Sequence, residues 1–577
     1  LNIVDYNNIH SVQNLKQVEC DFWIPFVNQS IYNLTTDIKY KTIQSANKEK
    51  TNLDEYVWAS DNHYGWTELE DHEIYGKGLL HSNKGWKGYT LNVTSQQWLT
   101  PNDFANTSNS GSIWYHILVV IVPDEVKYKQ NASMYITGGG MPNADGSNLP
   151  NHKDEDIRVA AALATSTGII TGCLFQIPNE HTTFTSDPIQ KSRSEDAIIA
   201  FTWDHYLNNN KDTEWLLRFP MVKGSLRAMD AMKEFVAKKL PQLDTSLDYF
   251  IVAGASKRGW TTWDVAAVDS TRVVAMVPIV LDAINFVDVM KHQYQSYNGW
   301  SWALQDYLDM NIMTRLDEPN MLLLQQQVDP YFYRDRLTMP KLVVNAVADE
   351  FQQPDDTHYW WDEMPGPKHF IMTPNAEHSE ATGIFEIVPA IGGWIQTLLK
   401  KEPVPEFTWD ISKDTGAITA TLNEHGIVKE ARVWYAYSCG NNPDGKKRRD
   451  FRIANADSPC KCGLEVKGMC TNLKSFWTPK KLTESKNADG QRTYTAHIDA
   501  PEDGRWVAYF IDIVYAKNKI DSLIPVIDIL PGFIPRDPFQ RLQFTTEVSV
   551  WPNTFPYPGC GIVNGVDTGI ECLATIV

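Results

Sequence analysis

A chain of 577 residues is longer than one ordinary domain, so two or three domains are expected. Hydrophobic residues make up 43% and charged residues 21%, a balance that is typical of a folded protein with a large core and excludes a disordered one. The 52 basic and 71 acidic residues give a formal net charge of -19, which repels phosphate backbones and argues against nucleic acid as a partner.

The first quarter of the chain is rich in polar and aromatic residues. Alternation of apolar and polar residues predicts a strand over residues 89–99, and the apolar run of residues 113–123 predicts the next strand. We therefore expect residues 1–125 to form an N-terminal segment that packs on the core or extends it.

From residue 126 to 400, short apolar strands alternate with amphipathic helices. Strands are predicted over residues 133–140, 169–177, 249–256, 273–281, 340–350 and 368–378, and helices over 154–168, 225–240 and 257–269. Continuous apolar strands separated by helices indicate a mostly parallel sheet with helices on both faces. The predicted fold class is α/β.

The segment 400–407 carries two prolines and reads as a linker. Beyond it, the apolar pattern has period two in aromatic-rich stretches over residues 431–438, 492–499, 505–516 and 542–551. Residues 401–577 are therefore predicted to form an antiparallel β-sandwich domain.

Ser256 lies between small residues, where a predicted strand becomes a helix. A strand, a tight turn of small residues that carries a serine, and a helix form the geometry of a nucleophile elbow. The motif runs from Gly254 to Gly259 and is one residue longer than Gly-x-Ser-x-Gly. The alternative is a turn that only needs small residues.

A reactive serine needs a base, and the base needs an acid that orients it. Asp349 ends one predicted parallel strand and His378 follows the next, so both belong to the carboxyl edge where sites form in such sheets. We predict a triad of Ser256, Asp349 and His378. Asp282, which follows the strand over residues 273–281, is a rival acid.

An oxyanion hole needs two amide donors. One is predicted from Lys257, and the other from Gly139 or Gly140 in a glycine-rich loop that follows a strand; the alternative is an ordinary glycine turn. The side chains of Lys257 and Arg258 either assist an anionic group or the oxyanion, or belong to a solvated helix start. For Arg258, a structural ion pair is a further alternative.

Three features indicate a secreted or luminal protein. The sequence opens on Leu1 without an initiator methionine, as a chain does after signal-peptide removal. Six cysteines lie in the C-terminal part, and they fit disulfides of undetermined connectivity better than a zinc site, because no histidine has matching spacing. The third feature is a set of Asn-x-Ser/Thr sequons, and the alternative is that they arise by chance in an Asn-rich sequence. They make Asn28, Asn33, Asn92, Asn106 and Asn131 candidate N-glycosylation sites. Separately, no apolar run approaches the roughly 20 residues needed to span a membrane.

Several sequence segments resemble those of a known protein family. "FIVAGASKRGWTTWDVAAVD", "AMVPIVLDAINF", "YRDRLTMPKLVVNAVADEF" and "PNAEHS" resemble the PhoPQ-activated pathogenicity-related proteins, whose eukaryotic relatives include the autocrine proliferation repressor protein A group. The resemblance extends from "LDEYVW" to "FTTEVSV". It implies an α/β-hydrolase core with a C-terminal β-domain, in which Ser256 is the nucleophile, Asp349 the acid and His378 the base. Ala348 stands where relatives often have glycine.

Two functions follow as hypotheses. The first is a secreted serine hydrolase that acts on an ester or peptide-type carbonyl of an unidentified small-molecule or peptide substrate. The second is a secreted signal that uses the hydrolase scaffold to bind a cell-surface receptor, as the resemblance implies for some family members. No nucleotide, flavin or metal motif is evident, so no cofactor is implied.

Overall fold

The structure is a computed structural model of the chain. It describes residues 50–77, 85–143, 146, 148–423, 425–439, 445, 447–456, 459–516 and 541–577. The predicted glycosylation sites Asn28 and Asn33 lie outside the described residues.

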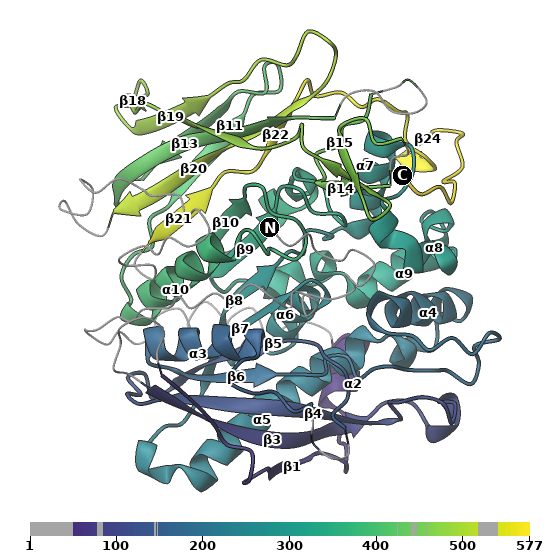
Figure 1. Cartoon of the computed structure of the whole chain (residues 1–577), viewed down its shortest axis with the longest axis vertical. Coiled ribbons are helices and arrows are strands. Elements are labelled where there is room, and N and C mark those ends of the chain that lie inside the picture. The colour runs from purple at the N-terminus through teal and green to yellow at the C-terminus, as the bar shows by residue number, and fades with distance from the viewer. Residues whose placement is uncertain are drawn as a thin grey trace.

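A ten-stranded mixed sheet runs through the molecule (Figure 1). Its strand order is β1-β3-β4-β6-β5-β7-β8-β9-β10, with β2 paired to β3. Neighbours from β6 to β10 are parallel, and β1 to β4 form an antiparallel edge. The strands are β1 (Gly65–Glu68), β2 (Ile74–Lys77), β3 (Gly85–Gln97), β4 (Ile113–Pro123), β5 (Asn131–Ile136), β6 (Ile170–Leu174), β7 (Tyr249–Ala255), β8 (Val273–Ile279), β9 (Lys341–Ala346) and β10 (Lys368–Thr373).

Helices cover both faces of this sheet, which explains its uninterrupted apolar strands. Every residue of β6 and β9 is buried, as expected for parallel strands that are packed on both sides. Val343 packs with the helices of one face, whereas Leu342 and Val344 pack with α10 on the other. The first face carries α4 (Glu195–Asn208), α5 (Arg218–Lys239), α6 (Lys257–Val268), α7 (Phe286–Tyr297) and α9 (Pro319–Val328), and the second carries α3 (Glu155–Thr167) and α10 (Ile384–Lys400). The predicted α/β-hydrolase core is confirmed.

Local sequence sets the ends of α3 as predicted. Asp154 is the N-cap, and its carboxylate accepts the amides of Asp156 and Ile157. Gly168 follows the last helical residue with φ 76°, the left-handed conformation that glycine adopts without strain. In contrast, α5 begins at Arg218 rather than at the predicted Ser225, because its first turn is as apolar and buried as its middle.

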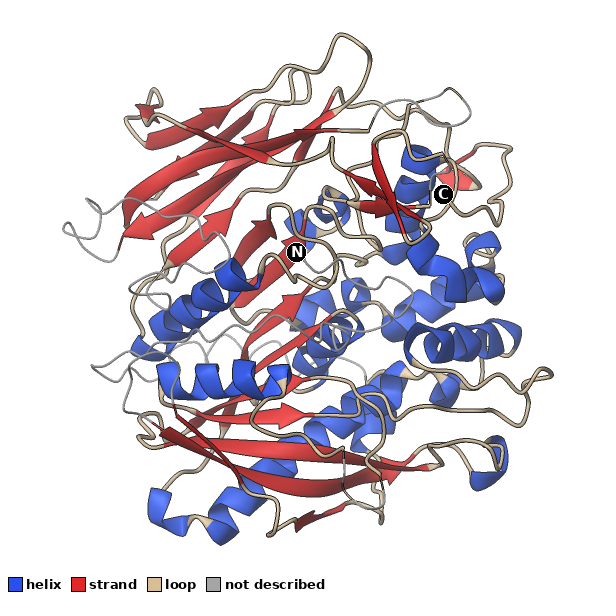
Figure 2. Cartoon of the chain, in the orientation of Figure 1, coloured by secondary structure: helices blue, strands red, loops and turns tan. Residues whose placement is uncertain are grey.

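The C-terminal part contains antiparallel sheets, as the period-two pattern predicted. One has the order β11-β12-β19-β18, and another the order β17-β13-β20-β21 with β22 paired to β20. Figure 2 shows these two sheets at the opposite end of the molecule from β1. Their strands are β11 (Phe407–Ile411), β12 (Ile418–Leu422), β13 (Ile427–Tyr437), β17 (Thr478–Lys481), β18 (Ser485–Lys486), β19 (Arg492–Ala496), β20 (Val507–Ala516), β21 (Leu542–Thr545) and β22 (Ser549–Trp551).

The sandwich and the α/β core share one hydrophobic cluster. Ile418 of β12 and Ile511 of β20 belong to the same buried cluster as Trp394 of α10 and Ile371 of β10. The amide of Met372 also donates to Oγ1 of Thr545 at 2.9 Å. The two parts are therefore joined by apolar packing as well as by the connecting segment.

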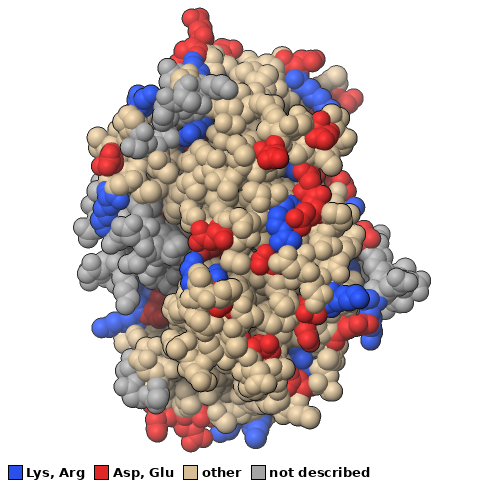
Figure 3. Space-filling view, turned by 90° about the vertical axis from the view of Figure 1, so that its right-hand side faces the viewer, with Lys and Arg blue, Asp and Glu red and all other residues tan. Residues whose placement is uncertain are grey.

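Three disulfides hold the C-terminal part, and they confirm the preference for disulfides over zinc. The pairs are Cys439–Cys462, Cys460–Cys470 and Cys560–Cys572. Among the described residues, no helix has the length and apolar character that crossing a membrane would require. Figure 3 shows one face of the molecule, on which basic and acidic side chains are interspersed.

Candidate active site

Ser256 occupies a sharp turn between β7 and α6. Its backbone has φ 58° and ψ -128°, an unusual conformation for a residue with a side chain. A Cβ atom on Gly254 would lie 2.7 Å from the carbonyl oxygen of Arg258, and one on Gly259 would lie 2.8 Å from that of Ile279. The glycines are needed because α6 passes close to β7 and β8 as it leaves the turn, which is the requirement of a nucleophile elbow.

The structure brings Ser256, His378 and Asp349 together. Oγ of Ser256 lies 2.8 Å from Nε2 of His378, and Nδ1 of the same ring lies 2.7 Å from Oδ2 of Asp349. Asp349 lies just beyond the end of β9 and His378 just beyond the end of β10, and these strands are parallel neighbours. The three side chains therefore meet at the carboxyl edge of the sheet.

The acid and the base are both fixed by their surroundings. Oδ1 of Asp349 accepts the amides of Phe351 at 2.7 Å and Gln352 at 3.2 Å. The amide of His378 donates to Oε2 of Glu350 at 3.1 Å, and the Phe351 ring lies 4.5 Å from the imidazole. Burial, together with the nearby Glu377 and Asp349, raises the pKa of Glu350 well above its usual range. These contacts leave the imidazole little freedom to turn away from Ser256.

The rival acid, Asp282, is bound elsewhere. Its Oδ1 accepts the indole N–H of Trp360 at 2.6 Å, and its amide donates to Oε1 of Gln352 at 2.7 Å. Burial raises the pKa of its carboxyl well above the ordinary value. Because both ring nitrogens of His378 are already engaged by Asp349 and Ser256, the geometry favours Asp349.

The glycine loop leaves the sheet next to the elbow. Strand β5 is the parallel neighbour of β7, and Ile136 at its end is paired with Gly254. Gly139 has φ 111°, and no hydrogen bond of the described residues uses the amides of Gly139 and Gly140. Lys257 is the first residue of α6, so its amide has no acceptor within the helix. The predicted donor residues thus lie in adjacent loops on the same edge of the sheet.

The side chains of Lys257 and Arg258 enter a buried group of charges. Nζ of Lys257 lies 2.8 Å from both Glu195 and Asp196. Arg258 contacts Glu195 at 2.6 Å through Nη2 and donates from Nε to the carbonyl of Ile177 at 2.5 Å. Arg258 therefore forms the structural ion pair that the sequence left as one alternative.

The buried group of charges includes two acids, Glu195 and Asp196, that were not predicted from the sequence. Burial alone would raise the pKa of Glu195, but Arg258 and Lys257 outweigh burial and lower it. Glu195 and Asp196 open α4, and their order "SEDAII" is an ordinary acidic first turn of a helix, so only the fold reveals that they lie beneath the nucleophile.

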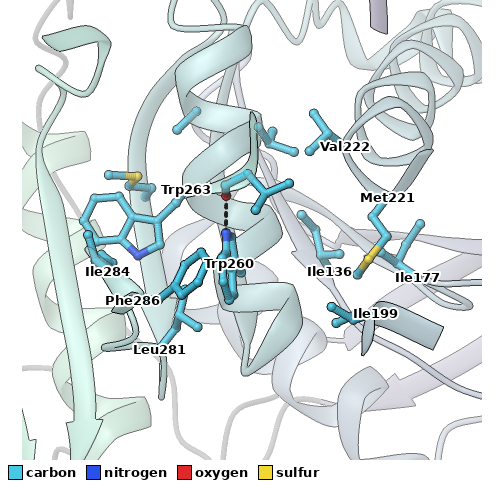
Figure 4. Packing of buried hydrophobic residues seen from close by; sticks show 14 of the residues in the cluster. Ile136, Ile177, Ile199, Met221, Val222, Trp260, Trp263, Leu281, Ile284 and Phe286 are labelled. Carbon is cyan, nitrogen blue, oxygen red and sulfur yellow. Dashed lines mark hydrogen bonds between the residues drawn. The ribbon is translucent and has the colours of Figure 1, made fainter. Parts of the chain in front are cut away.

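A small cavity opens beside the triad. It has a volume of about 70 Å³, and Ser256 and His378 form part of its wall. Figure 4 shows four of its apolar wall residues, Ile199, Trp260, Leu281 and Phe286, in the packed core around α6.

The described glycosylation sites differ in accessibility. Asn106 is exposed in a loop. Asn92 and Asn131 lie in β3 and β5, and the side-chain oxygen of the first and the side-chain nitrogen of the second are buried. Asn106 is therefore the most accessible of the three, and a glycan on Asn131 would have to be attached to a buried nitrogen.

Comparison with known proteins places the chain in a family. It is 33% identical over 530 residues to the autocrine proliferation repressor protein A of Dictyostelium discoideum, which covers 90% of this chain and 94% of that protein. Among solved structures, an acetyl xylan esterase from a Paenibacillus species is 11% identical with a TM-score of 0.38 and covers 63% of this chain and 99% of its own. Acetyl xylan esterase 1 from a Thermoanaerobacterium species is 13% identical with a TM-score of 0.35 and covers 62% of this chain and 96% of its own.

The sequence profile of the PhoPQ-activated pathogenicity-related proteins matches residues 53–452. The chain belongs to the PhoPQ-activated pathogenicity-related protein family.

Proposed function

We propose that the protein is a secreted serine hydrolase that cleaves an ester or amide bond. The observation that carries this proposal is the continuous pair of contacts from Ser256 through His378 to Asp349, at 2.8 Å and 2.7 Å. Both separations are within the range over which a proton passes directly between heavy atoms.

The proposed reaction has two stages. His378 accepts the hydroxyl proton of Ser256 through Nε2 while Oγ attacks the substrate carbonyl, and Asp349 stabilises the imidazolium that forms. Amides of Lys257 and of Gly139 or Gly140 hold the negative oxygen. The imidazolium then gives its proton to the departing alcohol or amine, which leaves an acyl group on Ser256. Water, activated by the same imidazole, releases the acid and restores the serine.

The three disulfides support the extracellular part of the proposal. Disulfides persist in oxidising compartments and are rare in the reducing cytosol. The accessible Asn106 agrees with exposure to the glycosylation machinery.

A serine-directed fluorophosphonate tests the chemistry. Wild-type protein is expected to be labelled at Ser256, and Ser256→Ala is expected to lose all labelling while its circular dichroism is unchanged. Ser225→Ala is a matched control, because this buried serine lies in α5 and donates only to the carbonyl of Met221 at 2.9 Å. Equal labelling of wild type and Ser256→Ala would contradict the proposal.

A second candidate function rests on the name of the Dictyostelium relative, a repressor of proliferation. In this alternative, the protein is a signal that binds a cell-surface receptor and uses the hydrolase fold as a scaffold. Adding purified wild-type and Ser256→Ala protein to cells and following their proliferation separates the two functions. Full activity of Ser256→Ala would favour the signal.

A further inference from the structure

The cavity beside Ser256 has an almost wholly apolar wall. It lies among α4, α6, α7 and the segment 302–316, which includes α8 (Gln305–Asp309). Trp260, Leu281 and Phe286 are part of this wall, and Figure 4 shows them close to one another. The remaining apolar wall residues are Ile199, Trp203, Ala283, Met290, Leu304, Tyr307, Ile312, Met313, Leu316 and Phe351.

The few polar groups on this wall are already satisfied. Oδ2 of Asp196 forms an ion pair with Nζ of Lys257 at 2.8 Å, and Oδ1 accepts a hydrogen bond from the hydroxyl of Tyr307 at 3.0 Å. Gln352 accepts the amide of Asp282 at 2.7 Å and donates to the carbonyl of Val280 at 3.4 Å. A charged or strongly polar group placed here would lose its hydration without a replacement partner, so the cavity selects an apolar group.

The volume of the cavity limits the length of that group. An apolar cavity of about 150 Å³ holds benzene, which has six carbon atoms. The cavity here has a volume of about 70 Å³, less than half of that value. It therefore accommodates on the order of two or three carbon atoms, not a ring or a long chain.

Two considerations assign the cavity to the acyl side of the substrate. The acyl group stays bonded to Ser256 after the first stage, whereas the leaving group must reach solvent before water can enter. Most residues that line the cavity are buried, including Met290, Ile312 and Leu316, so the cavity suits the part of the substrate that is retained. Lys257, whose amide is a candidate oxyanion donor, also forms part of its wall, which places the carbonyl oxygen and the acyl chain beside the same residue.

We propose that this hydrolase is selective for short, unbranched acyl chains, with propionyl and butyryl groups filling the cavity. The proposal rests on the proposed function of Ser256. Each buried methylene is expected to raise kcat/KM about fourfold, until the cavity is full.

A series of p-nitrophenyl esters from acetate to octanoate tests the proposal, because only the acyl chain varies. We expect kcat/KM to peak at propionate or butyrate and to fall at least tenfold by octanoate. Met313→Ala enlarges the cavity and is expected to move the peak to hexanoate or beyond. Ala283→Val fills part of it and is expected to move the peak to acetate. Met229→Ala is the matched control, since Met229 is equally buried in the core but does not line the cavity.

The outcomes separate this proposal from the proposed function. If Ser256 is labelled by the fluorophosphonate but wild type prefers octanoate, or if Ala283→Val keeps the wild-type profile, the acyl-cavity proposal is wrong and the hydrolase remains. A preference that follows the alcohol of acetate esters instead of the acyl chain would also overturn it. If wild type shows neither labelling nor turnover, the proposed hydrolase function itself is wrong. If Met313→Ala does not fold, the acyl-chain profile of Ala283→Val alone tests the acyl-cavity proposal.

Discussion

Replacing Asp349 by asparagine tests the role of a single oxygen atom in the triad. Oδ1 of Asp349 accepts two amides and Oδ2 faces Nδ1 of His378. An asparagine that keeps its oxygen toward those amides keeps the loop in place, but presents an N–H₂ group to the imidazole. The imidazole then avoids two opposed N–H groups only by carrying its proton on Nε2, which faces Ser256. In that tautomer it no longer accepts the hydroxyl proton.

The expected loss in kcat is about 10⁴-fold, the size seen when the acid of a serine triad is replaced by its amide. This corresponds to about 5 kcal/mol in the activation free energy. The free energy of unfolding is expected to change by less than about 1 kcal/mol, because the two amide contacts of the loop are preserved. The reverse orientation of the side chain would give up both contacts and is disfavoured.

Turnover of p-nitrophenyl butyrate at pH 7 to 8, with circular dichroism of each variant, measures this effect. Asp282→Asn is the matched control, since Asp282 follows the neighbouring strand but is bound to Trp360, and its kcat is expected to stay within tenfold of wild type. A kcat for Asp349→Asn above one tenth of wild type would refute the reasoning. So would an equal loss for Asp282→Asn, which would make Asp282 the acid.

Three further predictions concern two buried carboxyl groups and a glycine of the loop that follows β5. Glu195→Gln leaves Arg258 and Lys257 under-compensated in the core, so the free energy of unfolding is expected to fall by about 3–5 kcal/mol at pH 7. Because the pKa of Glu195 is lower in the folded state than in the unfolded state, the stability that its carboxylate contributes is present above about pH 4.5 and is lost as the pH falls toward the folded-state pKa. Urea unfolding should therefore show that the stability difference between wild type and Glu195→Gln narrows below pH 4.5. A stability difference that widens there would contradict the assignment. Burial, with Asp154 nearby, raises the pKa of Asp156 to about 7. Between about pH 4 and 7 the folded state therefore holds a proton that the unfolded state has lost, and the free energy of unfolding declines as the pH rises through that range. Above pH 7, Asp156→Asn should be more stable than wild type by on the order of 3 kcal/mol in urea unfolding, and equal stability there would refute the pKa shift. Gly138→Ala places a Cβ atom 2.0 Å from Nη2 of Arg258, so the loop must shift. The free energy of unfolding in urea should fall by about 1–3 kcal/mol, and turnover should fall at least tenfold. Wild-type values in both assays would contradict this contact.

The sequence predicted Ser256, Asp349 and His378 because each follows an apolar run that could only be a buried strand. Parallel strands end at a common edge, so residues far apart in the chain became neighbours by topology alone. The same reasoning did not reach Glu195 and Asp196. They begin a helix whose contacts with Lys257 and Arg258 depend on how α4 packs, and no local pattern records those contacts.

Other parts of the fold carried signals that conflict. Helix α10 contains Pro389 and the pair Gly392–Gly393, which read as breakers, yet its apolar face packs on the sheet and on the sandwich, and this burial outweighs propensity. The number and clustering of cysteines predicted disulfides. Their connectivity could not be predicted from the sequence. Cys439 pairs with Cys462, although Cys460 is nearer to Cys439 in the chain.

The elbow is shaped by main-chain atoms and by two glycines, Gly254 and Gly259. The hydroxyl of Ser256 takes no part in this support, since the contact it makes is with the imidazole of His378. Replacing Ser256 by alanine therefore removes a single oxygen atom from the protein and leaves the support of the elbow in place. A strain that carries such an allele would show which traits of the organism depend on bond cleavage and which depend only on the protein's presence.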